Sequence, residues 1–135
     1  MDASVFVRAL VEPLDEDAIG WVEATNDRRI AARTPELALA EIANAFVGYV
    51  RAGLLDEERA LARLRYVLDM PIDVVSLRLL AVPALGVSLT RGLSAYDACY
   101  VALANGCGAT LVTADRRLAA EAEQSALLPG TGPPA

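Results

Sequence analysis

The chain has 135 residues, of which 55% are hydrophobic and 22% charged, and its formal net charge is −6. This length and composition predict one globular domain with its own core and exclude a disordered protein. The absence of histidine excludes Ser-His-Asp and Cys-His catalytic centres, and two cysteines cannot supply the four ligands of a zinc site. The acidic balance argues against binding nucleic acid through bulk positive charge, although every basic residue is an arginine, which suits phosphate geometry.

The predicted elements alternate between helices and short strands. In chain order they are a helix over 13–26, a weak strand over 29–33, a helix from 34–35 to 51, an amphipathic helix over 56–68, a strand over 71–75, helices over 78–91 and 94–105, a strand over 109–112 and a helix over 115–124. Thr34 is the expected N-cap of its helix, and Pro83 is expected to break or kink the helix that contains it.

This alternation predicts a three-layer α/β/α sandwich with a central parallel sheet. We expect residues 1–128 to form the domain and residues 129–135, rich in proline and glycine, to form a disordered tail. Neither a secretory signal nor a membrane-spanning segment is evident, so the sequence predicts a soluble, cytoplasmic protein without a membrane partner.

Glu41 is a charged residue in an otherwise apolar helix. Glu41 and Asn44 are the only polar residues between Leu37 and Val47, and they share one helix face. A helix that is apolar on most sides is expected to be buried, and a buried carboxylate needs a partner. No basic residue within this part of the helix supplies one, which favours a bound cation. The alternative is a glutamate at an exposed helix edge.

Three more carboxylates occupy positions with both structural and functional interpretations. Asp97 is the only charged residue between Arg91 and Asp115, and with Ser94 it fits a capping box. Asp115 follows a predicted strand and opens a helix, so it fits an N-cap, but ligands in parallel α/β proteins bind at this same end of the strands. Asp2 alone indicates nothing, since a terminal aspartate is ordinarily solvated.

The four carboxylates together indicate a metal site. Each lies where a parallel sheet could bring it to one end of the strands, and four converging carboxylates would repel one another unless a divalent cation held them ionised. Oxygen ligands without histidine or cysteine select Mg²⁺ or Mn²⁺ over zinc.

Four motifs contain these carboxylates: Asp2-Ala-Ser4, Glu41-Ile-Ala-Asn44, the run Tyr96-Asp97-Ala98-Cys99-Tyr100-Val-Ala-Leu-Ala, and Leu-Val-Thr113-Ala-Asp115-Arg-Arg-Leu. In order and spacing they resemble the motifs of the PIN domain, and more narrowly those of VapC-like toxins from toxin–antitoxin pairs. The last two are the more specific, and the resemblance covers nearly the whole chain.

The resemblance implies a PIN-like fold and a metal-dependent endoribonuclease. Asp2, Glu41, Asp97 and Asp115 would be its catalytic, metal-binding quartet for Mg²⁺ or Mn²⁺, with Thr113 supporting Asp115 and Ser4 supporting Asp2. It also implies an RNA substrate, a cognate antitoxin protein and a homodimer.

One departure concerns the first strand. The family places several apolar residues before its first aspartate, whereas only Met1 precedes Asp2 here. We therefore expect either a severely shortened first strand or residues missing before Met1.

Two other functions compete with this interpretation. The first is a catalytically inactive PIN-like binding protein, in which the four carboxylates would be dispensable. The second is a phosphohydrolase that uses Asp2 as nucleophile, which would need a lysine near the phosphate, and the chain has none.

Overall fold

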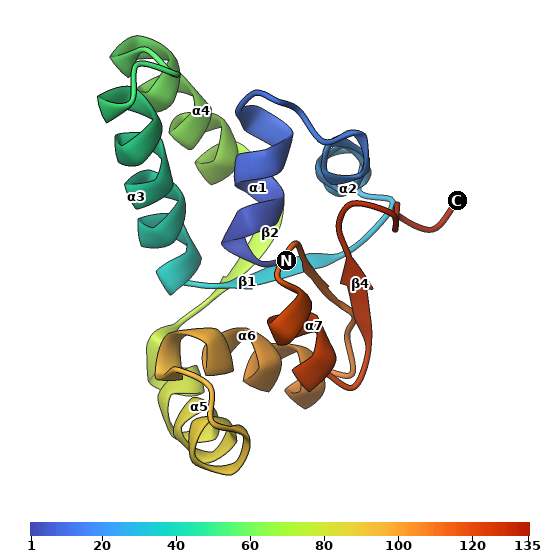
Figure 1. Ribbon diagram of the computed structural model, residues 1–135. Coiled ribbons are helices and arrows are strands. Elements are labelled where there is room, and N and C mark those ends of the chain that lie inside the picture. The colour runs from blue at the N-terminus through green and yellow to red at the C-terminus, as the bar shows by residue number, and fades with distance from the viewer.

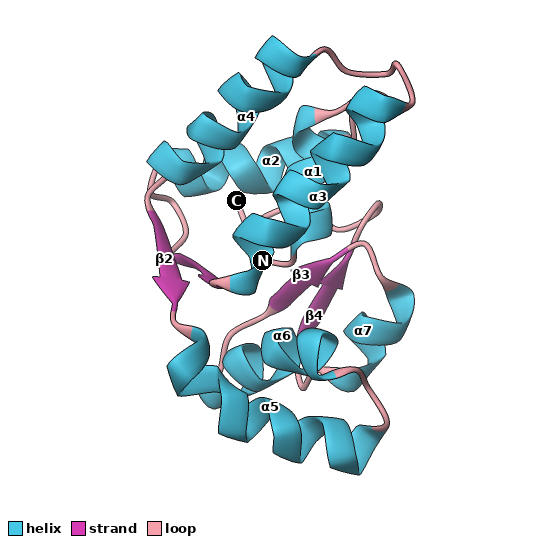
Figure 2. Ribbon diagram, turned by 90° about the vertical axis from the view of Figure 1, so that its left-hand side faces the viewer, coloured by secondary structure: helices cyan, strands magenta, loops and turns pink.

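The computed structural model describes residues 1–135. Its elements are α1 (Ala3–Leu10), α2 (Glu16–Asn26), β1 (Ala32–Pro35), α3 (Leu37–Arg51), α4 (Glu57–Asp69), β2 (Ile72–Val75), α5 (Leu77–Arg91), α6 (Ala95–Gly106), β3 (Leu111–Thr113), α7 (Arg116–Glu121) and β4 (Ser125–Leu127). Helices α1–α4 lie on one side of the strands and α5–α7 on the other (Figures 1 and 2). The predicted three-layer α/β/α arrangement with parallel strands is confirmed.

The parallel strands form two separate pairs. β1 pairs with β2, with Ala32 opposite Ile72, and β3 pairs with β4. Residues Met1 and Asp2 lie between the pairs: the amino nitrogen of Met1 donates to the carbonyl of Arg33 at 2.7 Å, and the amide of Asp2 donates to the carbonyl of Val112 at 2.9 Å. Through these two bonds, Met1 and Asp2 connect β1 to β3.

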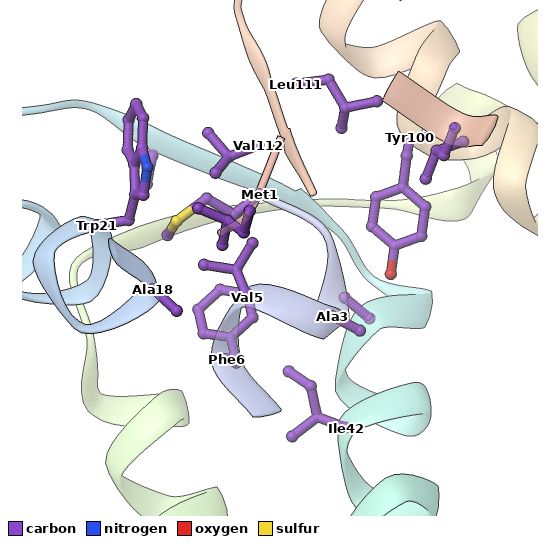
Figure 3. Close-up of a cluster of buried hydrophobic side chains, with 14 of the residues drawn as sticks. Met1, Ala3, Val5, Phe6, Ala18, Trp21, Ile42, Tyr100, Leu111 and Val112 are labelled. Atoms are coloured by element: carbon purple, nitrogen blue, oxygen red, sulfur yellow. The ribbon is translucent and has the colours of Figure 1, made fainter. Parts of the chain in front are cut away.

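The core fills the space between the layers with small and branched apolar side chains. From α1, Val5 and Phe6 are fully buried, and Figure 3 shows them beside Met1 and Ala18. On the other side, α6 buries six of its 12 residues, including Val101, because it lies between the strands and α5. A helix apolar on most sides is typical of such a position.

The predicted N-cap at Thr34 is wrong, and the break expected at Pro83 is not present. Thr34 does not cap α3, because β1 continues through Pro35, and its buried hydroxyl instead donates to the carbonyl of Met1 at 2.9 Å. Pro83 does not interrupt α5, which is continuous from Leu77 to Arg91. Pro83 and Leu79 are both exposed, so water can satisfy the carbonyl that loses its helical partner.

The end of the chain differs from the sequence expectation. The predicted last helix is shorter, and β4 follows it beside β3. Residues 129–135, expected to be disordered, lie against α2: the indole of Trp21 donates to the carbonyl of Thr131 at 2.8 Å, and the amide of Gly130 donates to Asp17 at 2.7 Å.

None of the helices is by itself long and apolar enough to cross a membrane, and α5 and α6 reach that length and composition only as a pair bent by 108°.

Candidate functional site

Asp2 is fixed by two hydroxyl groups at the ends of the strands. The hydroxyls of Ser4 and Thr113 donate to its Oδ2 atom at 2.7 and 2.6 Å. Both hydroxyls also accept a backbone amide from the turn after β3, that of Ala114 at Ser4 and that of Asp115 at Thr113, each at 3.0 Å. This network orients the buried Asp2 carboxylate and leaves its Oδ1 atom without a hydrogen bond inside the protein.

Asp115 has the helix-capping role considered from the sequence. It is the N-cap of α7, and its Oδ1 atom accepts from the amides of Arg117 and Leu118 at 2.9 and 3.1 Å. Its own amide donates to Thr113, whose hydroxyl also bonds Asp2, so the two aspartates flank one buried side chain.

Asp97 takes part in the N-terminal cap of α6 only through its backbone amide. Its amide donates to the hydroxyl of Ser94, the N-cap of α6, at 3.1 Å. The returning bond of a capping box, from the Ser94 amide to the Asp97 carboxylate, is not formed. The half-buried carboxylate of Asp97 therefore makes neither a hydrogen bond nor an ion pair, although it lies in the first turn of an apolar helix.

Glu41 is held by a tyrosine from the opposite layer. The hydroxyl of Tyr100, on α6, donates to the Oε1 atom of Glu41, on α3, at 3.0 Å. Figure 3 shows the tyrosine ring reaching from α6 toward α3 and Ala3. Tyr100 is buried, and its burial, with the charges of Asp2 and Glu41, raises the pKa of the hydroxyl far above its usual range. The hydroxyl therefore remains a hydrogen-bond donor.

The charges of Asp2 and Asp97 act on the carboxylate of Glu41. Burial raises the pKa of Glu41, the hydrogen bond from Tyr100 opposes that shift, and the charges of Asp2 and Asp97 raise the pKa further. Glu41 is exposed as a whole residue, but its carboxylate is shielded enough for the two neighbouring charges to act on it. Burial also lowers the pKa of the adjacent Met1 amino group to about 6.

The carboxylate oxygens of this site are suitable ligands for a hard divalent cation. The protein has five salt bridges, and none of them uses Asp2, Glu41, Asp97 or Asp115. All the available ligands are oxygens, as Mg²⁺ and Mn²⁺ prefer. In the side-chain conformations shown, no three acidic or cysteine side chains are close enough together to hold an ion. The structure thus gathers the carboxylates in one region without forming a complete coordination shell.

A family model of the PIN domain matches residues 1–123, which include every residue of this site. The chain belongs to the PIN-domain family. It is 38% identical over 121 residues to Ribonuclease VapC3 from Pyrobaculum aerophilum, an alignment that covers 88% of this chain and 90% of the relative. The crystal structure of PAE2754 from the same organism matches with a TM-score of 0.72 and 25% identity, covering 94% of this chain and 86% of that one.

In this PIN domain the structure changes the interpretation of Glu41. The sequence predicted a buried carboxylate without a side-chain partner, but Glu41 lies on the exposed face of α3 and is bonded to Tyr100. The expectation of a buried α3 is wrong because only Ala38, Ile42 and Phe46 of this helix are buried. Thr113 supports Asp115 as expected and also bonds Asp2.

Sequence reasoning missed Tyr100 as a residue of this PIN-domain site. It appeared only as part of a motif, although it lies three residues after Asp97 and is thus on the same face of α6. A tyrosine inside an apolar helix needs a partner for its hydroxyl, and that requirement was the available signal.

Proposed function

We propose that this PIN domain is a metal-dependent endoribonuclease and the toxin of a toxin–antitoxin pair. The observation that carries the proposal is the set of carboxylates at the strand ends. The charges of Asp2 and Asp97 both act on Glu41, and Asp115 is joined to Asp2 through Thr113. None of the four carboxylates forms a salt bridge with an arginine. The similarity to a protein named Ribonuclease VapC3 supports the same reaction class.

Asp2, Glu41, Asp97 and Asp115 would hold Mg²⁺ or Mn²⁺. When bound, such an ion supplies charge stabilisation and water activation for hydrolysis of an RNA phosphodiester. The chain's own residues prepare the ligands. Thr113 and Ser4 fix Asp2 through one carboxylate oxygen. Tyr100 fixes Glu41 in the same manner, while the Asp97 carboxylate is free of bonds within the protein.

A cleavage assay on structured RNA tests the reaction. We expect internal cuts that a chelator abolishes, that added Mn²⁺ restores, and that Glu41→Gln reduces at least a hundredfold. Glu23→Gln is the matched control, because Glu23 is an exposed glutamate on α2 and forms no side-chain bond. Equal cleavage by Glu41→Gln and wild type would indicate a contaminating nuclease and would favour the inactive, binding-only PIN domain.

The antitoxin partner fits the α3–α4 hairpin. The exposed apolar residues of this hairpin include Leu54, Leu61 and Leu68, while Leu55 and Val67 face the core. Leu61, Leu68 and the half-buried Leu64 share one side of α4, the pattern that receives an amphipathic partner segment. The carboxylate site would attract a basic group carried by that segment.

The homodimer fits a different surface, the exposed side of α5. Leu79, Val82 and Leu89 on this side are 71%, 80% and 79% exposed. A two-fold interface brings one patch against its own copy, so a self-associating patch must avoid facing like charges. Between Arg78 and Arg91, α5 has no charged residue at all, which meets this condition despite the chain's net charge of −6.

A further inference from the structure

Tyr96 is an exposed aromatic side chain beside a carboxylate of the candidate site. It is 72% exposed and follows the N-cap of α6 by two residues. Tyr100 and Tyr66 both form hydrogen bonds through their hydroxyls, whereas Tyr96 forms no side-chain hydrogen bond. Neither packing nor hydrogen bonding within the protein accounts for this residue. A single exposed tyrosine is ordinary on a protein surface, so its position decides what it means.

The position of Tyr96 on α6 places it at the rim of the carboxylates. Residues three and four apart share a helix face, so Tyr96 and Asp97 lie one turn before Tyr100 on the same side of α6. Tyr100 is buried on that side, and its hydroxyl reaches Glu41 at 3.0 Å. The face is buried at Tyr100 and exposed at Tyr96, so it leaves the core within one turn. The ring of Tyr96 therefore borders the site.

An arginine flanks the site from α7. Arg116 directly follows Asp115, is exposed, and forms neither a salt bridge nor a side-chain hydrogen bond. The side chain of the next residue, Arg117, donates to the carbonyl of Gly92 at 3.0 Å, two residues before the N-cap of α6. This bond holds the beginnings of α6 and α7 together. A guanidinium and an aromatic ring, both without partners, thus lie next to two of the four carboxylates.

An RNA strand needs an attraction that the charge of this protein does not supply. The net charge is −6 and the site consists of carboxylates, which repel phosphates. Stacking of a base on an aromatic ring does not depend on charge and strengthens binding by about fivefold or more per base. A base presents a free face only where it is unpaired and unstacked, as in loops, bulges and ends. The ligand that fits Tyr96 is therefore an unpaired nucleotide.

We propose that Tyr96 and Arg116 form a nucleotide subsite beside the carboxylates, in which an unpaired RNA base stacks on the Tyr96 ring and Arg116 binds an adjacent phosphate. This subsite rests on the proposed ribonuclease function and gives its substrate class, which is RNA unpaired at the cleavage point. Arginine suits the phosphate because its planar guanidinium can donate two parallel hydrogen bonds. Every base has an aromatic face, so the subsite selects unpaired RNA and not a base sequence.

Binding of a short single-stranded RNA in chelator tests the subsite without cleavage. The probe contains a central 2-aminopurine, whose fluorescence falls when it stacks on an aromatic ring. Wild type should quench the probe, and Tyr96→Ala should abolish quenching and weaken binding at least fivefold. Tyr96→Phe keeps the ring and should bind as wild type does. Tyr66→Ala, which removes an exposed tyrosine of α4, is the matched control and should leave the affinity unchanged.

The salt dependence of the same binding reports on Arg116. Arg116→Gln should reduce the slope of log affinity against log salt by about 0.7, the share of one phosphate contact on a single strand. Tyr96→Ala should keep the wild-type slope, because stacking releases no counterion. Arg65→Gln removes the same charge from an exposed position on α4 and should also keep that slope. When the probe is annealed to its complement, Tyr96→Ala and wild type should bind it equally.

Equal binding of the single-stranded probe by wild type and Tyr96→Ala, or an unchanged salt slope in Arg116→Gln, would overturn the subsite. Weaker RNA binding that accompanies a change of oligomeric state in sedimentation measurements would overturn it as well. Loss of antitoxin affinity in Tyr96→Ala with unchanged RNA binding would assign this side chain to the antitoxin interface instead. The cleavage assay reports separately on the proposed function: a protein that shows the expected binding but cuts no RNA would keep the subsite and lose the nuclease function.

Discussion

The hydroxyl of Thr113 connects the fold to the candidate site. It is fully buried, donates to the carboxylate of Asp2 and accepts the amide of Asp115. A hydrogen bond to a charged group contributes more than one between neutral groups, and losing it leaves the buried carboxylate undersatisfied. The position of Asp2 in the site therefore depends on a neutral side chain as much as on its own charge.

Thr113→Val tests this at the scale of one residue. The substitution keeps the shape but removes the hydroxyl, so the free energy of unfolding in metal-free buffer should fall by about 2 kcal/mol in urea titrations. Thr90→Val is the control, because the Thr90 hydroxyl bonds the Gly86 carbonyl at an exposed position and its loss should cost little. A Thr113→Val protein as stable as wild type would show that the hydroxyl network is not structural.

At the scale of elements, two exposed apolar surfaces are assigned to two different partners. The surface on α5 is assigned to a second copy of the chain, and the one on the α3–α4 hairpin to the antitoxin. In Figure 1 these elements lie at opposite ends of the molecule, so each can be changed without altering the other.

Val82→Asp and Leu61→Asp therefore act as controls for each other. Val82 and Leu61 are both exposed, so the aspartates should leave the fold intact. Val82→Asp should convert a dimer into a monomer in sedimentation measurements, because it places two like charges across a two-fold axis. Leu61→Asp should keep the dimer and weaken antitoxin binding at least tenfold. A monomeric wild type, or a dimer in both variants, would refute the α5 interface.

Helices could be predicted from the sequence where the hydrophobic pattern and a capping residue agree. The helix α4 is amphipathic and is capped by Asp56, and α6 is capped by Ser94, so the positions of both helices could be predicted from the sequence. Elements that depend on distant contacts were not predictable. Thr34 has the chemistry of an N-cap, yet pairing of β1 with β2 keeps it extended, and short β4 exists only because β3 is beside it.

At the scale of the whole molecule, the alternation of strands and helices predicted that residues at the ends of parallel strands would lie at one edge of the strands. Parallel strands bring their carboxyl ends to one edge, which is why residues as far apart as Asp2 and Thr113 are bonded. The contact between Glu41 and Tyr100 could not be predicted, because it depends on how α6 and α3 approach across the layers. Burial of the Met1 nitrogen likewise follows only from the separation of the two strand pairs.

A calorimetric titration of the purified protein with Mn²⁺ tests most directly whether these carboxylates form a metal site. Wild type should show saturable binding, and Asp97→Asn should weaken it at least tenfold, because Asp97 is the carboxylate with no other bond in the protein. Asp69→Asn, which removes an exposed aspartate at the end of α4, should bind Mn²⁺ as wild type does. Equal affinity in wild type and Asp97→Asn would contradict a metal centre at this site.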